Sequence, residues 1–190
     1  MILTKQKSLT TYAALLRGIN VGGNAIIKMA DLRGLFEKIG FADVVTYIQS
    51  GNVIFKATYT DSRMLEKKIE TALAKTYTFK PKVVIRTFSE MEKIVAHIPK
   101  DWHSATDKKC NVIFLRASID SPDILKGLNP KDSIESITYA AGVLYWSAHT
   151  SDLSQSSMVK LSSQPIYQEM TVRNLNTTKK MYEIMREIAK

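Results

Sequence analysis

A glycine-rich segment near the N-terminus holds the residues best suited to bind an anion. Its glycines, asparagines and flanking cations are Arg17, Gly18, Asn20, Gly22, Gly23, Asn24 and Lys28. Glycine allows backbone N–H groups to converge on an anion, and a helix that begins after the segment adds its positive N-terminal dipole. The segment therefore predicts a site for a phosphate or carboxylate group. The alternative interpretation is a tight reversal of the chain whose charged side chains are simply solvated.

Two better-defined phosphate motifs do not occur in this segment. A P-loop requires G-x-x-x-x-G-K-[ST] between a strand and a helix. Gly18 and Gly23 have the required spacing, but Asn24 and Ala25 stand where the lysine and the hydroxyl residue are required. The dinucleotide fingerprint G-x-G-x-x-G is missing as well. The sequence thus excludes a Walker-type NTPase and leaves a less specific anion site.

A second polar cluster, Gln49-Ser50-Gly51-Asn52, lies between two β-rich runs and predicts a hairpin turn. Gln49, Ser50 and Asn52 are candidate ligand-binding residues, and the alternative is that they cap the turn. In a split βαβ arrangement we expect this turn at the end of the sheet where the first strand begins. The glycine-rich segment leaves the opposite end, so the two clusters need not form one site.

A third polar cluster precedes the last predicted helix. It contains Arg173 and Asn174, and the expected N-cap of the helix is Asn176 or Thr177. Arg173 and Asn174 either join a binding site or fix the helix to the rest of the chain.

No arrangement typical of catalysis or metal binding accompanies these clusters. His97, His103 and His149 are far apart in the sequence and lack metal-ligand spacing, and the nucleophile motif G-x-S-x-G does not occur. No carboxylate pair stands out, so the sequence identifies no catalytic residue, metal or cofactor. Because the one cysteine, Cys110, lies in an apolar run, we expect it to be a buried, unreactive thiol.

Hydrophobic periodicity predicts the elements that position these clusters. In the first half, strand, helix, strand, strand, helix and strand fall on residues 11–17, 29–39, 44–48, 53–55, 61–77 and 82–86. That order is the ferredoxin-like split βαβ pattern, with helices on one face of an antiparallel sheet. The other face is solvated, binds something or is covered by a further layer.

The second half repeats the order strand, helix, strand, strand. These elements fall on residues 111–116, 121–128, 134–139 and 143–146, and a last helix follows from about residue 177 to 189. We interpret this half as a second related unit. The expected fold is an α/β (α+β) chain with mainly antiparallel sheets. It consists of an N-terminal subdomain over residues 1–97 and a C-terminal subdomain, with the closing helix, over residues 98–190.

The chain of 190 residues has a net charge of +9. Residues 1–97 carry 15 basic and 8 acidic residues, whereas residues 98–190 carry 12 and 10. A basic half attracts nucleic acid, phosphorylated metabolites or anionic lipid, and a well-solvated surface is an equally good interpretation of scattered lysines. The N-terminus lacks the apolar segment of a signal peptide, and no stretch reaches about 18 consecutive apolar residues. We therefore expect a cytoplasmic location and no membrane partner.

The chain contains three longer motifs, Leu16-Arg17-Gly18-Ile19-Asn20-Val21-Gly22-Gly23, Ile27-Lys28-Met29-Ala30-Asp31-Leu32 and Thr46-Tyr47-Ile48-Gln49-Ser50-Gly51-Asn52-Val53. Together these segments resemble a family of bacterial proteins, the domain-of-unknown-function family 1697. Thr171, Arg173, Asn174 and Asn176-Thr177 resemble a second signature, from which Leu175 departs, because the family usually has tryptophan there. The resemblance covers residues 10–189. It implies two ferredoxin-like subdomains and no established activity, substrate or cofactor.

These patterns support three functional hypotheses. In the first, a small phosphorylated or carboxylated ligand binds at the glycine-rich segment, with catalysis left open. Arg17 and Lys28 neutralise its charge, the backbone of Gly22 and Gly23 cradles it, and Asn20 orients it. The second is nucleic-acid binding by the basic N-terminal half, although the RRM motif does not occur. The third is a scaffold that uses a sheet face or an edge strand. We favour the first because polar residues and glycines gather in loops, where sites usually lie.

Overall fold

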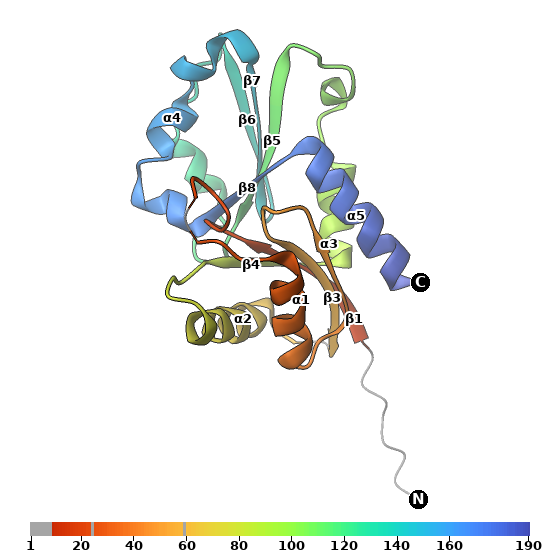
Figure 1. Cartoon of the computed structure of the whole chain (residues 1–190). Helices are drawn as coiled ribbons and strands as arrows, with labels where there is room; N and C mark the ends of the chain where they lie inside the picture. Colours follow the sequence, from red (N-terminus) through yellow and green to blue (C-terminus); the bar gives the residue numbers. More distant parts are fainter. Residues whose placement is uncertain (1–8, 24, 59) are drawn as a thin grey trace, which may run out of the picture. The chain divides into compact units, whose positions relative to one another are not determined.

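Two four-stranded antiparallel sheets organise the chain (Figure 1). The computed structural model describes residues 9–23, 25–58 and 60–190, so Asn24 of the predicted anion site lies outside the described residues. Each sheet belongs to its own compact unit. The first unit comprises the chain up to Glu90 together with Met181–Lys190, and the second comprises Met91–Lys180.

The first sheet has the strand order β2-β3-β1-β4. Its elements follow one another as β1 (Leu9–Leu16), α1 (Met29–Lys38), β2 (Ala42–Tyr47), β3 (Asn52–Thr58), α2 (Ser62–Thr76) and β4 (Val83–Thr87). This is the ferredoxin-like arrangement that the hydrophobic periodicity predicted, and every neighbouring pair of strands is antiparallel. Asp61 starts α2 as an N-cap, because its carboxylate accepts the N–H of Arg63 at 2.7 Å.

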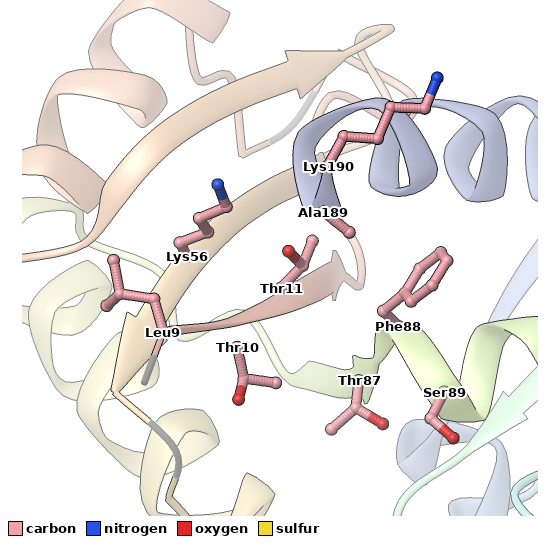
Figure 2. Close-up of a pocket in the computed structure, with 9 residues that line it drawn as sticks. All are labelled: Leu9, Thr10, Thr11, Lys56, Thr87, Phe88, Ser89, Ala189 and Lys190. Atoms are coloured by element: carbon pink, nitrogen blue, oxygen red, sulfur yellow. The ribbon is translucent and has the colours of Figure 1, made fainter. Parts of the chain in front are cut away.

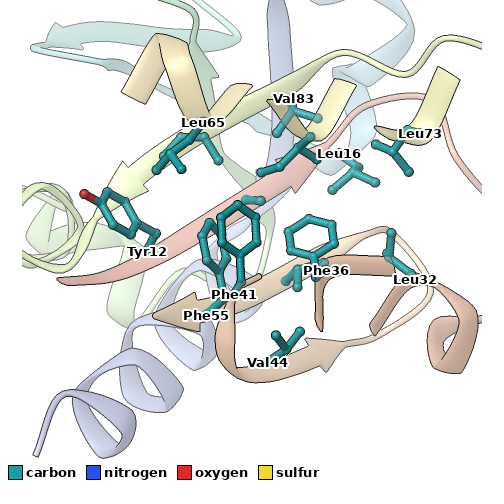
Figure 3. Packing of buried hydrophobic residues seen from close by; sticks show 14 of the residues in the cluster. Tyr12, Leu16, Leu32, Phe36, Phe41, Val44, Phe55, Leu65, Leu73 and Val83 are labelled. Atoms are coloured by element: carbon teal, nitrogen blue, oxygen red, sulfur yellow. The ribbon is translucent and has the colours of Figure 1, made fainter. Parts of the chain in front are cut away.

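Aromatic side chains fill the core between this sheet and its two helices (Figure 3). Tyr12 and Leu16 lie on the same face of β1, and both are fully buried. Phe55 of β3 stacks on Tyr12 with 5.7 Å between ring centroids and on Phe41 with 4.3 Å. Phe36 of α1 meets Phe55 edge to face. The ring packing fixes α1 on the sheet and so fixes where the glycine-rich segment ends.

The other face of the first sheet is also buried. Ala13 and Leu15, which alternate with the core residues of β1, have no exposed surface. Residues 181–189 of α5 (Leu175–Ala189) belong to this unit, and Tyr182 stacks on Phe88 with 5.7 Å between ring centroids. Of the three possibilities for this face, the structure shows coverage by a further layer.

The second sheet has the order β6-β7-β5-β8, which reproduces the topology of the first. Its elements are β5 (Lys108–Leu115), the 3-10 helix η2 (Pro122–Gly127), β6 (Glu135–Ala140), β7 (Val143–His149), η3 (Thr150–Gln155), α4 (Ser157–Leu161), η4 (Pro165–Glu169) and β8 (Met170–Asn174). The periodicity did not predict β8. With it, the second unit has the complete ferredoxin-like set of four strands.

Two helices connect or close the units. Residues from Met91 of α3 (Phe88–Ala96) belong to the second unit, together with the 3-10 helix η1 (Lys100–His103). The boundary between the two units thus falls within α3, a few residues before the predicted division after His97. The last residues of the chain, Met181–Lys190, belong to the first unit again.

Candidate functional site

The side chain of Asn20 clamps the glycine-rich segment, here called the glycine loop (residues 17–28), to the hairpin turn at residues 48–51. Its Nδ2 donates to the carbonyls of Ile27 at 3.0 Å and Gln49 at 2.8 Å. Its Oδ1 accepts the N–H of Ile27 at 2.8 Å. Both amide hydrogens of Asn20 are therefore committed to the backbone, so Asn20 positions the loop and the turn relative to each other.

The glycine loop and the hairpin turn lie at the same end of the first sheet, and the prediction that they lie at opposite ends was wrong. The N–H of Leu16, at the end of β1, donates to the carbonyl of Gly51 at 2.8 Å. The physical reason is the crossover through α1, which returns the chain so that β2 runs in the same direction as β1. The end of β2 and the end of β1 then share one edge of the sheet.

The hairpin turn is built tightly around Gly51. Its φ is +76°, and a Cβ there would come within 2.5 Å of Ile19 Cδ1 and 2.9 Å of Leu16 Cβ. Asn52 is fully buried, and its Nδ2 donates to the carbonyl of Tyr47 at 3.0 Å and to Ser50 Oγ at 3.1 Å. The capping role considered for Asn52 is thus present in the structure, whereas the side chain of Gln49 is exposed.

The backbone of the glycine loop is in the left-handed region at several positions. These are Gly18 at φ +72°, Asn20 at +54°, Gly22 at +60°, Gly23 at +76° and Ala25 at +51°. The first three alternate with residues that are not left-handed, and such alternation directs successive N–H groups to one side and forms anion-binding concavities. Gly22 and Gly23 are exposed, and a Cβ on either would meet nothing within 4 Å.

The cations and the helix N-terminus of the predicted site adjoin this loop. Lys28 is exposed and stands at the N-cap of α1 without a side-chain cap hydrogen bond. The first-turn N–H groups of a helix carry partial positive charge and can donate hydrogen bonds to an anion. The N–H of Arg17 donates to the carbonyl of Lys82 at 2.8 Å, so the start of β4 brings another lysine to this edge.

The second unit provides an internal comparison for this edge. The N–H of Leu115 donates to the carbonyl of Gly142 at 2.9 Å, as Leu16 does to Gly51. Asp120 Oδ1 accepts the N–H of Gly142 at 2.8 Å and the hydroxyl of Tyr139 at 3.0 Å, so a side chain again ties the loop to the turn. The loop itself differs, because residues 116–121 are about half as many as residues 17–28 and contain no glycine.

The charge at the equivalent position is reversed between the units. The N–H of Arg116 donates to the carbonyl of Glu169, as Arg17 does to Lys82, and the Arg116 guanidinium pairs with the Glu169 carboxylate at 3.1 Å. The first unit therefore has a cation where the second has the anion that neutralises its arginine. The fold requires the clamp and the turn, but neither the glycines nor the positive charge of the first edge.

Arg173 and Asn174 belong to the second unit. Arg173 Nη1 donates to the carbonyl of Val172 at 2.9 Å, and burial lowers the pKa of Arg173 to about 10. Asn174 caps α5, because its Oδ1 accepts the N–H of Thr177 at 2.7 Å. The prediction of Asn176 or Thr177 as the N-cap was wrong, since α5 begins earlier, at Leu175. Capping by Asn174 agrees with the alternative that this cluster fixes the helix.

A cavity of about 540 Å³ opens at the other end of the first sheet (Figure 2). Thr11, Lys56 and Phe88 line it on the sheet side, and Ala189 and Lys190 of the chain's end face them. Its polar groups are partly engaged, because Lys56 Nζ pairs with Asp43 at 3.0 Å and the hydroxyl of Thr87 donates to Glu90 at 2.8 Å. This cavity is separate from the glycine loop and holds none of the predicted site residues.

The structure also reveals polar groups that sequence spacing did not indicate. His149 Nδ1 lies 3.0 Å from Asp107 Oδ2 on the surface, since strand pairing of β5 and β7 places residues distant in sequence side by side. Glu135 is buried, and donors from three different segments surround its carboxylate. Cys110 is buried as expected, and burial raises the pKa of its thiol. Within the described ranges, no three potential ligands gather as a metal site requires.

The fold and the candidate site place this protein in the class of α+β proteins with two ferredoxin-like units, one of which has a glycine-rich loop between a strand end and a helix. The chain belongs to the family described as Protein of unknown function (DUF1697), whose model matches residues 9–145. Its structure is similar to that of the conserved bacterial protein SP0830 from Streptococcus pneumoniae, with 27% sequence identity and a TM-score of 0.81, covering 94% of this chain and 99% of that one. A search of curated proteins gives no match. None of the helices in the described part has the length and hydropathy to cross a bilayer.

Proposed function

We propose that the glycine loop of the first unit binds a small anionic ligand through a phosphate or carboxylate group. The comparison between the two units carries this proposal. Both units build the same sheet topology and tie the loop to the turn, yet only the first has left-handed glycines in the loop after its first strand. The helix that follows this loop has no side-chain cap at Lys28, whereas Ser121 caps the corresponding 3-10 helix of the second unit. Since the second unit folds without these features, folding alone does not explain them.

The predicted residues of the first unit have distinct parts in the proposed site. Lys28 and Arg17 supply positive charge, and the backbone N–H groups around Gly22 and Gly23 supply hydrogen-bond donors. Asn20 is a positioning residue, because its amide holds the loop against the carbonyl of Gln49. Ser50 and Asn52 support the turn, because Asn52 Nδ2 donates to the carbonyl of Tyr47 and to Ser50 Oγ. Catalysis is not part of the proposal.

The two other hypotheses receive less support. The large apolar side chains exposed in the described part of the chain are aliphatic, whereas binding of single-stranded nucleic acid relies on aromatic stacking. Strand addition at β4 is opposed by α2, because Glu70 and Glu66 accept the N–H groups of Val83 at 2.9 Å and Ile85 at 3.4 Å. A cytoplasmic location stays a prediction.

Calorimetric titration and thermal shift with inorganic phosphate, pyrophosphate and citrate at low ionic strength test the proposal. We expect saturable binding that Lys28→Ala weakens about fivefold, since one charge-assisted contact contributes about 1 kcal/mol. Lys38→Ala is the matched control, because Lys38 is also exposed and lies at the other end of α1, so its removal should leave binding unchanged. Equal affinity in both variants, or no binding of any of the three anions, would refute the proposed site.

A further inference from the structure

Three exposed aliphatic side chains adjoin the glycine loop and the hairpin turn. Val21 is 66% exposed, Ile26 69% and Ile48 47%. Val21 follows the clamp residue Asn20, Ile26 precedes the Ile27 carbonyl bound by it, and Ile48 precedes the Gln49 carbonyl bound by it. One amide group thus holds all three segments together. We call these three side chains the apolar patch.

The backbone conformation of Ile48 is unfavourable for isoleucine, so the stability of the fold does not explain why isoleucine stands at this position. Its φ is +49°, a left-handed conformation in which a β-branched residue is a genuine outlier. Glycine or asparagine adopts this conformation at much lower cost. Because nearly half of the side chain is exposed, Ile48 also gains little from burial in the core. An isoleucine at this position is better explained by a contact that it makes with another molecule.

Positive charge borders the apolar patch. Lys28 lies two residues after Ile26, and the start of β4 brings Lys82 next to the backbone of Arg17. Lys80, just before this strand, is exposed as well. A molecule that matches both properties carries a negative group and an aliphatic body. Three side chains are too few for a stable protein interface, which involves about 20 residues on each side, and they offer no aromatic ring for a base.

We infer that the apolar patch binds the aliphatic body of a small amphipathic anion whose phosphate or carboxylate group lies at the glycine loop. This inference rests on the proposed function, which supplies the anion site. The ligand class is then an alkyl or acyl chain with one anionic end. The same chemistry occurs in free metabolites and in lipid headgroups, and we commit to the free molecule.

A series of monoalkyl phosphates tests the inference in the full chain. We compare the dissociation constants of inorganic phosphate and of ethyl, butyl and hexyl phosphate by calorimetry. Complete burial of a methylene contributes about fourfold in affinity, so we expect about twofold per methylene against an open patch. Val21→Ser and Ile48→Asn should flatten this dependence on chain length and leave the affinity for inorganic phosphate unchanged. Val159→Ser is the control, because Val159 is 55% exposed in the second unit.

The outcomes separate the inference from the proposed function. If inorganic phosphate binds but longer chains bring no gain, the inference fails and the anion site stands. If no phosphate compound binds, the inference fails, and if citrate does not bind either, the proposed function fails with it. If the gain with chain length persists in Val21→Ser and Ile48→Asn, the patch is not the contact and the inference fails. Binding to phosphatidate vesicles without binding of hexyl phosphate would assign the patch to a membrane surface and overturn the free-ligand assignment.

Discussion

The buried carboxylate of Glu135 should control the stability of the second unit at low pH. Glu135 is 6% exposed and accepts four hydrogen bonds. The donors are Ser156 Oγ at 2.6 Å, Trp146 Nε1 at 2.8 Å, Ser157 N at 2.9 Å and Lys131 N at 3.0 Å. Burial alone would raise the pKa of Glu135, but these donors outweigh it and lower the pKa to about 2.

The direction of the pH effect follows from the lowered pKa. A carboxyl group with a depressed pKa in the folded state stabilises that state above its unfolded pKa of 4.5 and loses the contribution as the pH falls toward 2. The difference between the two pKa values corresponds to about 3.4 kcal/mol at pH 7 and about 1.4 kcal/mol at pH 3. The contribution therefore falls by about 2 kcal/mol over this pH range.

Urea denaturation of the wild type and Glu135→Gln at pH 7 and pH 3 measures this contribution. Glutamine keeps the shape but turns N–H groups toward donors, so we expect a loss of about 3 to 5 kcal/mol at pH 7. Because glutamine does not titrate, the difference should narrow by about 2 kcal/mol at pH 3. Trp102 and Trp146, both in the second unit, report its unfolding by fluorescence.

Two results show whether the ionisation of Glu135 causes the expected loss of stability at low pH. Glu37→Gln serves as a matched control, because Glu37 is on the surface of α1 and pairs with Arg33 at 2.8 Å. Such an exposed pair contributes about 0.5 kcal/mol or less, so this variant should unfold at nearly the same urea concentration as the wild type. A gap between wild type and Glu135→Gln that stays constant from pH 7 to pH 3 would refute the reasoning about its ionisation.

Three further predictions concern the clamp and the turn, and chemical denaturation followed by circular dichroism measures each. Gly51→Ala should lower the free energy of unfolding by about 3 kcal/mol, because the new Cβ would lie 2.5 Å from Ile19 Cδ1. Gly23→Ala has the same φ of +76° but open space around the new Cβ, so it should lower the free energy of unfolding by only about 1 kcal/mol. Equal losses in the two variants would show that backbone strain alone matters. Asn20→Ala should lose about 3 kcal/mol through its three backbone hydrogen bonds, and a loss below about 1 kcal/mol would argue against the clamp. Ile48→Asn should instead stabilise by about 1 kcal/mol, because asparagine tolerates the left-handed φ of +49°, and a destabilised variant would contradict this.

The hydrophobic pattern predicted most of the fold because its signal is local. The continuous apolar run of β1 indicates a strand buried on both faces, and the i, i+4 pair Leu32 and Phe36 indicates the buried face of α1. Strand β8 escaped prediction because its five residues, Met170–Asn174, follow a 3-10 helix and run directly into α5. Its strand character comes from pairing with β5, which lies far away in the sequence.

The candidate site was predictable in composition but not in geometry. Glycines and asparagines identified the loop, yet the roles of Asn20 and Asn52 depend on which carbonyl each amide reaches. Asparagine supports a left-handed backbone and also binds ligands, so its presence alone does not separate these roles. The shared edge of loop and turn required the direction of β2, which the pattern contains only through the crossover helix. Glu135 gave no sequence signal, because its donors are spread from Lys131 to Ser157.

The two units together separate what the fold needs from what it merely allows. Each has a loop side chain, Asn20 or Asp120, that ties the loop after its first strand to its hairpin turn. A duplicated architecture with the same solution in both halves indicates that this tie is a requirement of the topology. The glycines of the loop, the exposed lysine at the helix start and the strained Ile48 occur in the first unit alone. Each lowers the stability of the fold without a folding benefit. Features that cost stability in one half and are dispensable in the other are where binding is to be sought in this chain.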